Sequence, residues 1–430
     1  MKLELRQAFV RDVQWGEKTQ MKEGVLFIDK ADALSLLAEE KRLTHLDMDL
    51  ARPGESVRII PVKDVIEPRC KLEGKGECFP GFIGGSETVG NGATLVLKGA
   101  AVVTVGPIVS IQEGLVDMSG PGTEYNPYGA TCNVCLLVQP AAGIEKKEYE
   151  TALREAGIRL AWYIADKCRD AAIDRSDVYE MADSVEGKAA ECGSNLPRFV
   201  YVCQAISQGL LHDTFLYGVD VKQILPTLVQ PQEIMDGAMI SANCVSACDK
   251  QNTFHHQNNP VVMELCARHG KDLNFLGVIV TTEMMTLVGK IRSSEYTVKL
   301  AQMLGAQVAI ITEEGCGNPD TDICMNAKNL ELAGIKTVVI GNEVAGQNGA
   351  SQGLADVTPE MNAYVSCGNI NELVELPPMK KIIGDIRAIA NVSGGDEKSI
   401  GSDGTIVCEI QSIIGSTNEL GCSKIGCEWI

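Results

Sequence analysis

The sequence predicts an α/β protein in which a β-rich N-terminal part precedes a doubly wound, mostly parallel α/β domain. Up to about residue 141, apolar residues come in short or alternating runs bounded by Gly and Pro, as is typical of strands. Beyond the predicted boundary, short apolar runs alternate with segments of helical spacing, which favours parallel strands joined by right-handed crossovers. We therefore expect one domain over residues 1–192 and a second over residues 193–430.

The N-terminal part is expected to contain several strands and two helices. The predicted strands are 24–29, 57–60, 101–105 and 134–139. The predicted helices are 30–43 and 146–171. Residues 183–197 are rich in small and polar residues and are predicted to form a linker or surface loop.

The C-terminal part alternates strands with helices. The predicted strands are 199–205, 238–240, 275–281, 307–312 and 336–340, and the predicted helices are 260–269, 293–304 and 322–333. Ligands bind beyond the carboxyl ends of the strands in such a sheet. The loops that follow these strands are therefore the first places to search for chemistry.

Composition limits the class of function. The chain has 430 residues and a formal net charge of −19, without the basic footprint that nucleic-acid binding requires. Its N-terminus lacks the apolar core of a secretory signal, and its longest near-apolar stretch, 99–111, is too short to span a bilayer. Sixteen cysteines then indicate a reducing compartment. We expect a cytoplasmic protein that binds neither nucleic acid nor membrane.

The dipeptide Asn243-Cys244 directly follows the strand predicted at 238–240. A Cys thiol can attack the preceding carbonyl and convert the amide to a thioester. Loss of sulfur from Cβ leaves dehydroalanine, and hydrolysis of its imine tautomer leaves a pyruvoyl ketone. Such a ketone captures amines and withdraws electrons from them. On its own the dipeptide is a weak signal, because a Cys after a strand is more often a small buried hydrophobe.

Longer motifs distinguish these readings. The segment Asn243–Lys250 (NCVSACDK), followed by Asn258–Pro260 (NNP), resembles the self-cleavage site of the proprotein subunit of glycine, sarcosine and betaine reductase component B. Matching segments occur along nearly the whole chain: LARPGESVR at 50–58, PVKDVIEP at 61–68, DMSGPG at 117–122, GLLHDT at 209–214, YGVD at 217–220, GNPDTD at 317–322 and GASQ at 349–352.

This resemblance implies a proenzyme that is cleaved after Asn243 into chains 1–243 and 244–430. The second chain would begin with a pyruvoyl group derived from Cys244, and no metal or nucleotide cofactor is expected. The implied partners are a selenocysteine- or cysteine-containing subunit of component B, the small selenoprotein component A and the acetyl-phosphate-forming component C. A hetero-oligomer and a small amine substrate follow from the same resemblance.

Five further residues are candidates for the site. His212 could move a proton, and Asp249 and Lys250 lie in the cleavage segment, where Lys250 could stabilise a tetrahedral intermediate. Asn318 and Asp320 belong to a Gly-rich strand–helix loop that suits a substrate carboxylate. The same loop could equally be a turn that Asp320 caps.

Two cysteine pairs invite a metal or redox interpretation. Cys132 and Cys135 have the spacing of a metal knuckle, and Cys422 and Cys427 lie near the C-terminus. Because Cys135 falls in a strand-like apolar run, we expect it to be packed there as a structural thiol. The sequence does not decide whether either pair has a metal or redox role.

Two other functions remain open at this point. One is a D-proline reductase-type pyruvoyl proprotein, and the other is a non-catalytic, cysteine-rich scaffold or electron-transfer protein that stays uncleaved. Among the component B substrates, glycine and sarcosine have a nitrogen lone pair that can condense with a ketone, whereas betaine does not. Aromatic residues near Cys244 are few, which disfavours a cage for a quaternary ammonium. We therefore expect glycine or sarcosine.

Overall fold

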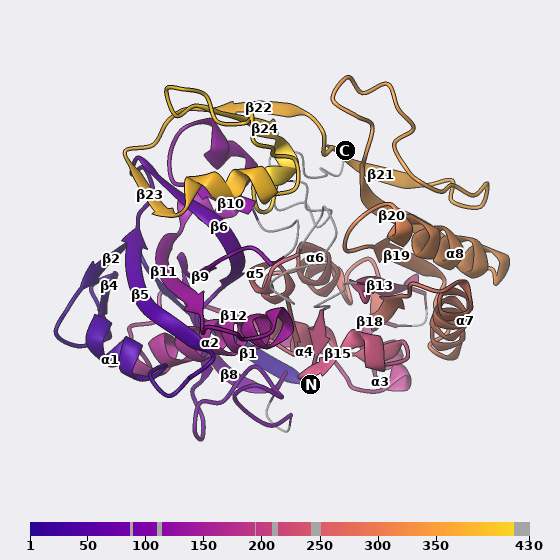
Figure 1. Ribbon diagram of the computed structural model, residues 1–430. Helices are drawn as coiled ribbons and strands as arrows, with labels where there is room; N and C mark the ends of the chain where they lie inside the picture. The colour runs from indigo at the N-terminus through magenta and orange to yellow at the C-terminus, as the bar shows by residue number, and fades with distance from the viewer. Residues whose placement is uncertain (87–88, 110–113, 194, 209–213, 242–250, 417–430) are drawn as a thin grey trace.

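The computed structural model describes residues 1–86, 89–109, 114–193, 195–208, 214–241 and 251–416. It is a mixed α/β structure, as the sequence predicts. A β-rich region formed by the first part of the chain packs beside a region in which strands and helices alternate (Figure 1). Apolar residues of the first strand, Leu3 and Leu5, share a core with Tyr201 and Phe275 of the second region. The two regions are therefore packed directly against each other.

The β-rich region contains three sheets. Their strand orders are β12-β1-β8-β7, β10-β6-β9-β11-β5 and β2-β4-β3. The strands are β1 Lys2–Phe9, β2 Asp12–Trp15, β3 Gln20–Lys22, β4 Val25–Ile28, β5 Leu43–Ala51, β6 Val57–Ile66, β7 Arg69–Lys71, β8 Gly92–Lys98, β9 Ala100–Val105, β10 Gly114–Asp117, β11 Cys132–Pro140 and β12 Arg175–Glu180. The long helix α2, Lys146–Lys167, packs against strands of the two larger sheets and buries its apolar face there.

The second region is built on one six-stranded sheet of order β16-β18-β13-β19-β20-β21. Neighbouring strands from β18 to β21 are parallel, and β16 is an antiparallel edge strand. The strands are β13 Arg198–Ile206, β16 Thr227–Val229, β18 Asn274–Glu283, β19 Val308–Thr312, β20 Lys336–Glu343 and β21 Tyr364–Asn369. Two separate apolar cores lie against this sheet, one including α6 and the other including α7 and α8.

The remaining elements are short or cover the sheets. The helices are α1 Lys30–Ser35, α3 Val185–Cys192, α4 Pro231–Met235, α5 Thr253–Gln257, α6 Pro260–Arg268, α7 Leu287–Met303 and α8 Asn318–Leu332. The 3-10 helices are η1 Pro121–Tyr125, η2 Pro127–Ala130, η3 Val221–Gln223, η4 Ile386–Asn391 and η5 Ile410–Ser412. A small sheet of order β15-β14-β17 contains β14 Phe215–Leu216, β15 Val219–Asp220 and β17 Met239–Ile240.

The last part of the chain returns to the β-rich region, as the yellow segment of Figure 1 shows. Strand β23, Lys381–Gly384, pairs in parallel with β6. Strands β22, Leu373–Leu376, and β24, Ile406–Glu409, pair with each other and contribute to a core with Ile60 and Leu115. The predicted domain boundary at 192/193 stays a prediction. The segment after residue 373 belongs to the predicted second domain in sequence, but it packs against the β-rich region.

Three predicted elements are corrected by the structure. The helix predicted at 30–43 ends at Ser35, because Leu43 already begins β5 and pairs with β11. The predicted linker 183–197 contains helix α3, which Ser184 caps by accepting a hydrogen bond from the Gly187 N–H. The strand predicted at 238–240 exists as β17, but it pairs antiparallel with β14 and is not part of the parallel sheet.

Two helices begin earlier than predicted. Helix α7 starts at Leu287, not at 293, and α8 starts at Asn318, not at 322. Thr286 caps α7 through its side chain, a polar start signal that precedes the apolar spacing. No helix among the described residues combines the length and the hydropathy that crossing a membrane requires.

Candidate functional site

The chain enters and leaves the segment 242–250 at neighbouring points in the protein interior. Strand β17 ends at Ile240, and the next residue, Ser241, is fully buried. The Ser241 backbone N–H donates a 3.1 Å hydrogen bond to the hydroxyl of Thr253, the first residue of α5. The described residues on the two sides of this segment therefore meet.

Helix α5 is fixed to strand β6. Its cap, Asn252, accepts a 3.0 Å hydrogen bond from the His255 N–H. Thr253 donates through its backbone N–H and its hydroxyl to the carboxylate of Asp64, at 2.9 and 2.6 Å. Gln257 exchanges two 3.0 Å hydrogen bonds with the backbone of Glu67. All of these groups are buried, so α5 is held rigidly where the two regions meet.

Carboxylates gather where strands of the parallel sheet end. Glu283 is the last residue of β18, Glu313 and Glu314 follow β19, and Asp322 lies in the first turns of α8. We call these four residues the strand-end cluster. Glu314 accepts hydrogen bonds from the Ile206 N–H at 2.8 Å and from the Thr214 hydroxyl at 2.5 Å. Its own N–H donates to Glu283 at 3.1 Å.

The environment of the cluster favours the protonated form of Glu283. Burial, and then the nearby charges of Glu313, Asp322 and Glu314, raise the pKa of Glu283 well above its ordinary value. Its Oε2 atom has no hydrogen-bond partner among the described residues. The raised pKa favours the protonated form of Glu283, a form that can donate a proton at the carboxyl ends of the strands.

Two adjacent histidines of α5 face different partners. His256 Nε2 lies 2.9 Å from Glu314 Oε1, so this ring touches the strand-end cluster. The His255 ring lies 3.1 Å from the Tyr128 hydroxyl, which also accepts a 2.5 Å hydrogen bond from Asn252. Burial, and then the neighbouring His256, lower the pKa of His255 to about 3, so His255 is neutral. Both histidines are buried in this capped helix.

One cation enters the cluster. The Lys290 ammonium contacts the carboxylate of Asp322 and donates a 3.0 Å hydrogen bond to the backbone carbonyl of Asn318. Burial raises the pKa of Asp322 to about 6, against the opposing effect of Lys290. The Asn318 side chain itself is exposed. Its predicted contact with substrate stays a prediction.

Asp320 has the geometry of a cap. One carboxylate oxygen accepts a 2.8 Å hydrogen bond from the Gly317 N–H, and the other accepts a 2.5 Å hydrogen bond from the Ala355 N–H. The residue is buried, and burial raises its pKa. These contacts agree with the capping interpretation, and a substrate-binding role for Asp320 stays a prediction.

Cys132 and Cys135 are both buried. Cys132 and Cys135 lie in β11 but belong to two different apolar cores. Burial raises the pKa of both, that of Cys132 to about 11. Within the described residues, no group of three His, Cys, Asp or Glu side chains is arranged to hold a metal ion. The packed position predicted for Cys135 is confirmed.

The residues of the predicted cleavage chemistry lie outside the described residues. These are Asn243, Cys244, Asp249 and Lys250, together with His212. The Cys422 and Cys427 pair also lies outside them. Their predicted roles stay predictions.

Sequence reasoning missed the strand-end carboxylates as candidates. Glu283 lies two residues beyond the strand predicted at 275–281, and Glu313 and Glu314 directly follow the strand predicted at 307–312. Position after a strand was therefore the signal that could have found them. His256 had no comparable signal, because Glu314, which its ring contacts, comes from a distant part of the chain.

Comparison with known proteins covers the whole chain. A family model described as glycine/sarcosine/betaine reductase component B subunits matches residues 1–428. The chain is 51% identical to glycine reductase complex component B subunits alpha and beta of Peptoclostridium acidaminophilum, over 98% of each chain. It is 48% identical to sarcosine reductase complex component B subunit alpha of the same organism, over 99% of each chain.

A more distant relative is a D-proline reductase proprotein of Acetoanaerobium sticklandii. The chain is 20% identical to it over 76% of this chain and 53% of that protein. No solved structure matches the chain.

Proposed function

Since this chain belongs to the family of glycine/sarcosine/betaine reductase component B subunits, we propose that it is the proprotein of the subunits that bind the amine substrate through a pyruvoyl group. It is thus an oxidoreductase subunit. The observation that carries the proposal is the family match over residues 1–428 in a chain that contains Asn243-Cys244. Support comes from the buried polar site in which the residues flanking 242–250 meet.

The proposed maturation needs only this chain and water. The Cys244 thiol adds to the Asn243 carbonyl, and the amide C–N bond breaks as the C–S bond forms. The Cα proton of residue 244 is then removed and the Cβ–S bond breaks, which leaves sulfur on residue 243 as a thiocarboxylate. Water hydrolyses the resulting enamine, through its imine tautomer, to a pyruvoyl group and ammonia. The products are chains 1–243 and 244–430.

A pyruvoyl ketone would capture the substrate amine and withdraw electrons from its nitrogen, which makes that nitrogen a better leaving group. Proton transfers at the site need groups that change protonation near neutral pH or hold a proton there. We propose Glu283 as a proton donor and His256, which touches Glu314, as the group next to it. His212, Asp249 and Lys250 remain proposed supporting residues, and Asn318 and Asp320 remain weaker candidates for substrate contact.

We also propose the wider setting of this subunit. A selenolate or thiolate on a separate component B subunit would displace the nitrogen at the α-carbon, and components A and C would carry the product to acetyl phosphate with electrons from a thioredoxin-type system. The substrate is proposed to be glycine or sarcosine, and the location cytoplasmic. For the 193–430 part we propose the doubly wound arrangement, which the cores against its sheet support.

The first alternative, a D-proline reductase-type proprotein, has less support than the main proposal. The D-proline reductase relative is 20% identical to this chain, whereas the glycine reductase relative is 51% identical. The second alternative, an uncleaved scaffold, is tested by one experiment.

If the chain is cleaved, denaturing electrophoresis should show two fragments of roughly 26 and 20 kDa. These are the masses expected when a 46.1 kDa chain is cut after residue 243. A single band of full length would contradict it. Mass spectrometry should identify pyruvoyl at the start of the smaller fragment.

A further inference from the structure

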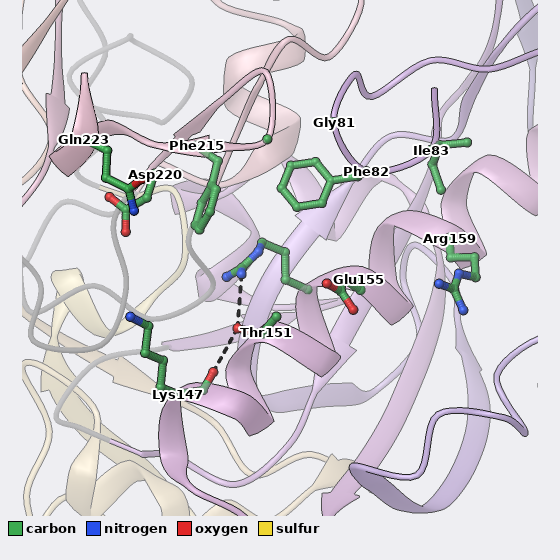
Figure 2. A pocket seen from close by; sticks show the side chains of 12 residues that line it. Gly81, Phe82, Ile83, Lys147, Thr151, Glu155, Arg159, Phe215, Asp220 and Gln223 are labelled. Atoms are coloured by element: carbon green, nitrogen blue, oxygen red, sulfur yellow. Dashed lines mark hydrogen bonds between the residues drawn. The ribbon is translucent and has the colours of Figure 1, made fainter. Parts of the chain in front are cut away.

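Helix α2 carries a buried arginine that faces a cavity. Arg154 is 4% exposed and lies at the wall of a cavity of about 470 Å³. Figure 2 shows Phe82 and Phe215 on the wall of this cavity, with Lys147 and Thr151 contributed by α2. The cavity is large enough for a small organic molecule.

Arg154 lacks the partners that a buried guanidinium needs. It has no ion-pair partner among the described residues, and its Nε and Nη1 atoms donate no hydrogen bond to any acceptor there. Its one hydrogen bond is a long one, 3.4 Å from Nη2 to the Thr151 hydroxyl. Burial lowers its pKa to about 10, so the side chain is still charged at neutral pH. An unpaired buried charge is costly, and a bound anion would relieve that cost.

Two aromatic rings fix the position of this charge. The guanidinium carbon lies 4.1 Å from the centroid of the Phe215 ring and 6.0 Å from that of Phe82. The two rings meet edge to face, with centroids 5.8 Å apart. Stacking on an aromatic face restrains a guanidinium while leaving the donors in its plane available.

The other charges around the cavity do not satisfy Arg154. Lys147 and Arg159 add positive charge to the lining. Of the two lining carboxylates, Glu155 lies 2.7 Å from the guanidinium of Arg42, and Asp220 accepts a 2.8 Å hydrogen bond from a backbone N–H of η3. The cavity therefore keeps a surplus of positive charge in a chain whose net charge is −19.

The cavity adjoins the site described above through the strand pair β14–β17. Phe215 pairs with Ile240, the last residue of β17, and Ile240 precedes Asn243 by three positions in the sequence. The neighbour of Phe215, Thr214, donates its hydroxyl hydrogen bond to Glu314 of the strand-end cluster. Two consecutive residues, Thr214 and Phe215 at the start of β14, thus contact the negative cluster and the positive cavity.

We propose that Arg154 binds the carboxylate of the amino-acid substrate, with the Phe215 ring holding the guanidinium in place. Glycine, sarcosine and betaine share a carboxymethyl group and differ only at nitrogen. A planar carboxylate pairs with guanidinium donors, and such charged hydrogen bonds are strong where water is excluded. This assignment rests on the proposed function, and it makes Arg154 a binding residue for the part that all three substrates have in common.

The test uses the processed protein in its complex with the partner subunits. Arg154→Met should raise the KM for glycine about 100-fold, the usual scale for losing one partner of a buried charge pair. Arg154→Lys should lose less, about tenfold, because an ammonium keeps the charge but not the fork of donors. Wild-type protein should prefer glycine over glycinamide by a similar factor, and Arg154→Met should abolish that preference. Cleavage after Asn243 should be unaffected.

Lys167→Met is the matched control, because it removes one positive charge from α2 outside the cavity and should leave the KM within about twofold. Equilibrium binding of acetate to the unprocessed chain tests the carboxylate site without turnover. Equal acetate affinity in wild type and Arg154→Met, or an unchanged preference for glycine over glycinamide, would overturn the assignment while cleavage and activity still supported the proposed function. An uncleaved, inactive wild-type chain would instead contradict the proposed function.

Discussion

The strand-end cluster is rich in negative charge and the Arg154 cavity in positive charge, although two adjacent residues contact them. Thr214 contacts the cluster through Glu314, and Phe215 stacks on Arg154. The cluster buries four carboxylates with Lys290 as the paired cation, whereas the cavity buries a guanidinium without a carboxylate partner among the described residues. The cluster therefore favours a positively charged group beside it, and the cavity favours a negatively charged one.

The buried ion pair of Arg58 and Asp117 provides a structural comparison for Arg154. Arg58 is fully buried and makes two hydrogen bonds, of 2.7 and 2.8 Å, to the carboxylate of Asp117. Both oxygens of that carboxylate are engaged by the same guanidinium. Arg58 and Arg154 are both buried, yet among the described residues only Arg58 has a carboxylate partner. The difference separates charge used for stability from charge held in readiness for a ligand.

The largest expected effect concerns the proposed pyruvoyl carbonyl. Cys244→Ala should abolish cleavage completely while the chain still folds, because alanine has no leaving group on Cβ. Denaturing electrophoresis should then show one band of full length. Cys248→Ala is the matched control and should be cleaved normally, since its thiol is not adjacent to the Asn243 carbonyl. Equal loss of cleavage in both variants would refute the assignment of Cys244.

The second effect is also complete, and it tests whether the ketone is used. Phenylhydrazine should inactivate the wild-type complex by capping the ketone, and borohydride with labelled glycine should attach the label to the 244–430 fragment. Mass spectrometry of the separated fragments measures both reactions. The Cys244→Ala chain should take up neither reagent. Full activity of protein that carries the hydrazine adduct would show that the ketone is not catalytic.

A third experiment compares the two buried arginines by stability. Arg58→Met should lower the free energy of unfolding by about 3–5 kcal/mol, because Asp117 is left buried without its partner. Arg154→Met should leave stability unchanged or raise it, because no carboxylate among the described residues is left buried without its partner. Thermal melting of the two variants without substrate measures the contrast. A Tm loss in Arg154→Met as large as in Arg58→Met would assign Arg154 to structure.

The smallest expected effect is a pH dependence in the strand-end cluster. The raised pKa of Glu283 means that its folded form holds a proton that the unfolded chain has lost. Stability from this group is therefore complete below the unfolded pKa of about 4.5 and is lost as pH rises through the folded pKa. Glu283→Gln cannot ionise, so its Tm should fall less between pH 5 and 8 than that of wild type, by a few degrees.

Asp322→Asn provides the companion measurement, with a window between 3.8 and about 6 set by the raised pKa of Asp322. Because asparagine cannot ionise, the Tm of this variant should fall less than that of wild type as pH rises through that window. Identical pH profiles in wild type and Glu283→Gln would mean that Glu283 is ionised in the folded protein.

The amino-acid sequence by itself determined the family, the α/β class and most of the strands of the parallel sheet. Apolar runs such as 199–205 and 307–312 mark those strands because they are buried on both faces, so local pattern and tertiary environment agree. The dipeptide Asn243-Cys244 needs no fold to be chemically competent. Motifs of this kind are read from neighbouring residues alone.

Only the tertiary structure decided which buried charges have partners. The helix predicted at 30–43 ends early because pairing of β5 with β11 claims Leu43, and that pairing joins residues about 90 positions apart. Likewise, Arg58 and Arg154 look alike in the sequence, and their difference depends on whether Asp117 or an open cavity lies opposite. The energy of a buried charge is set by what surrounds it in space, and the chain brings those surroundings from distant positions.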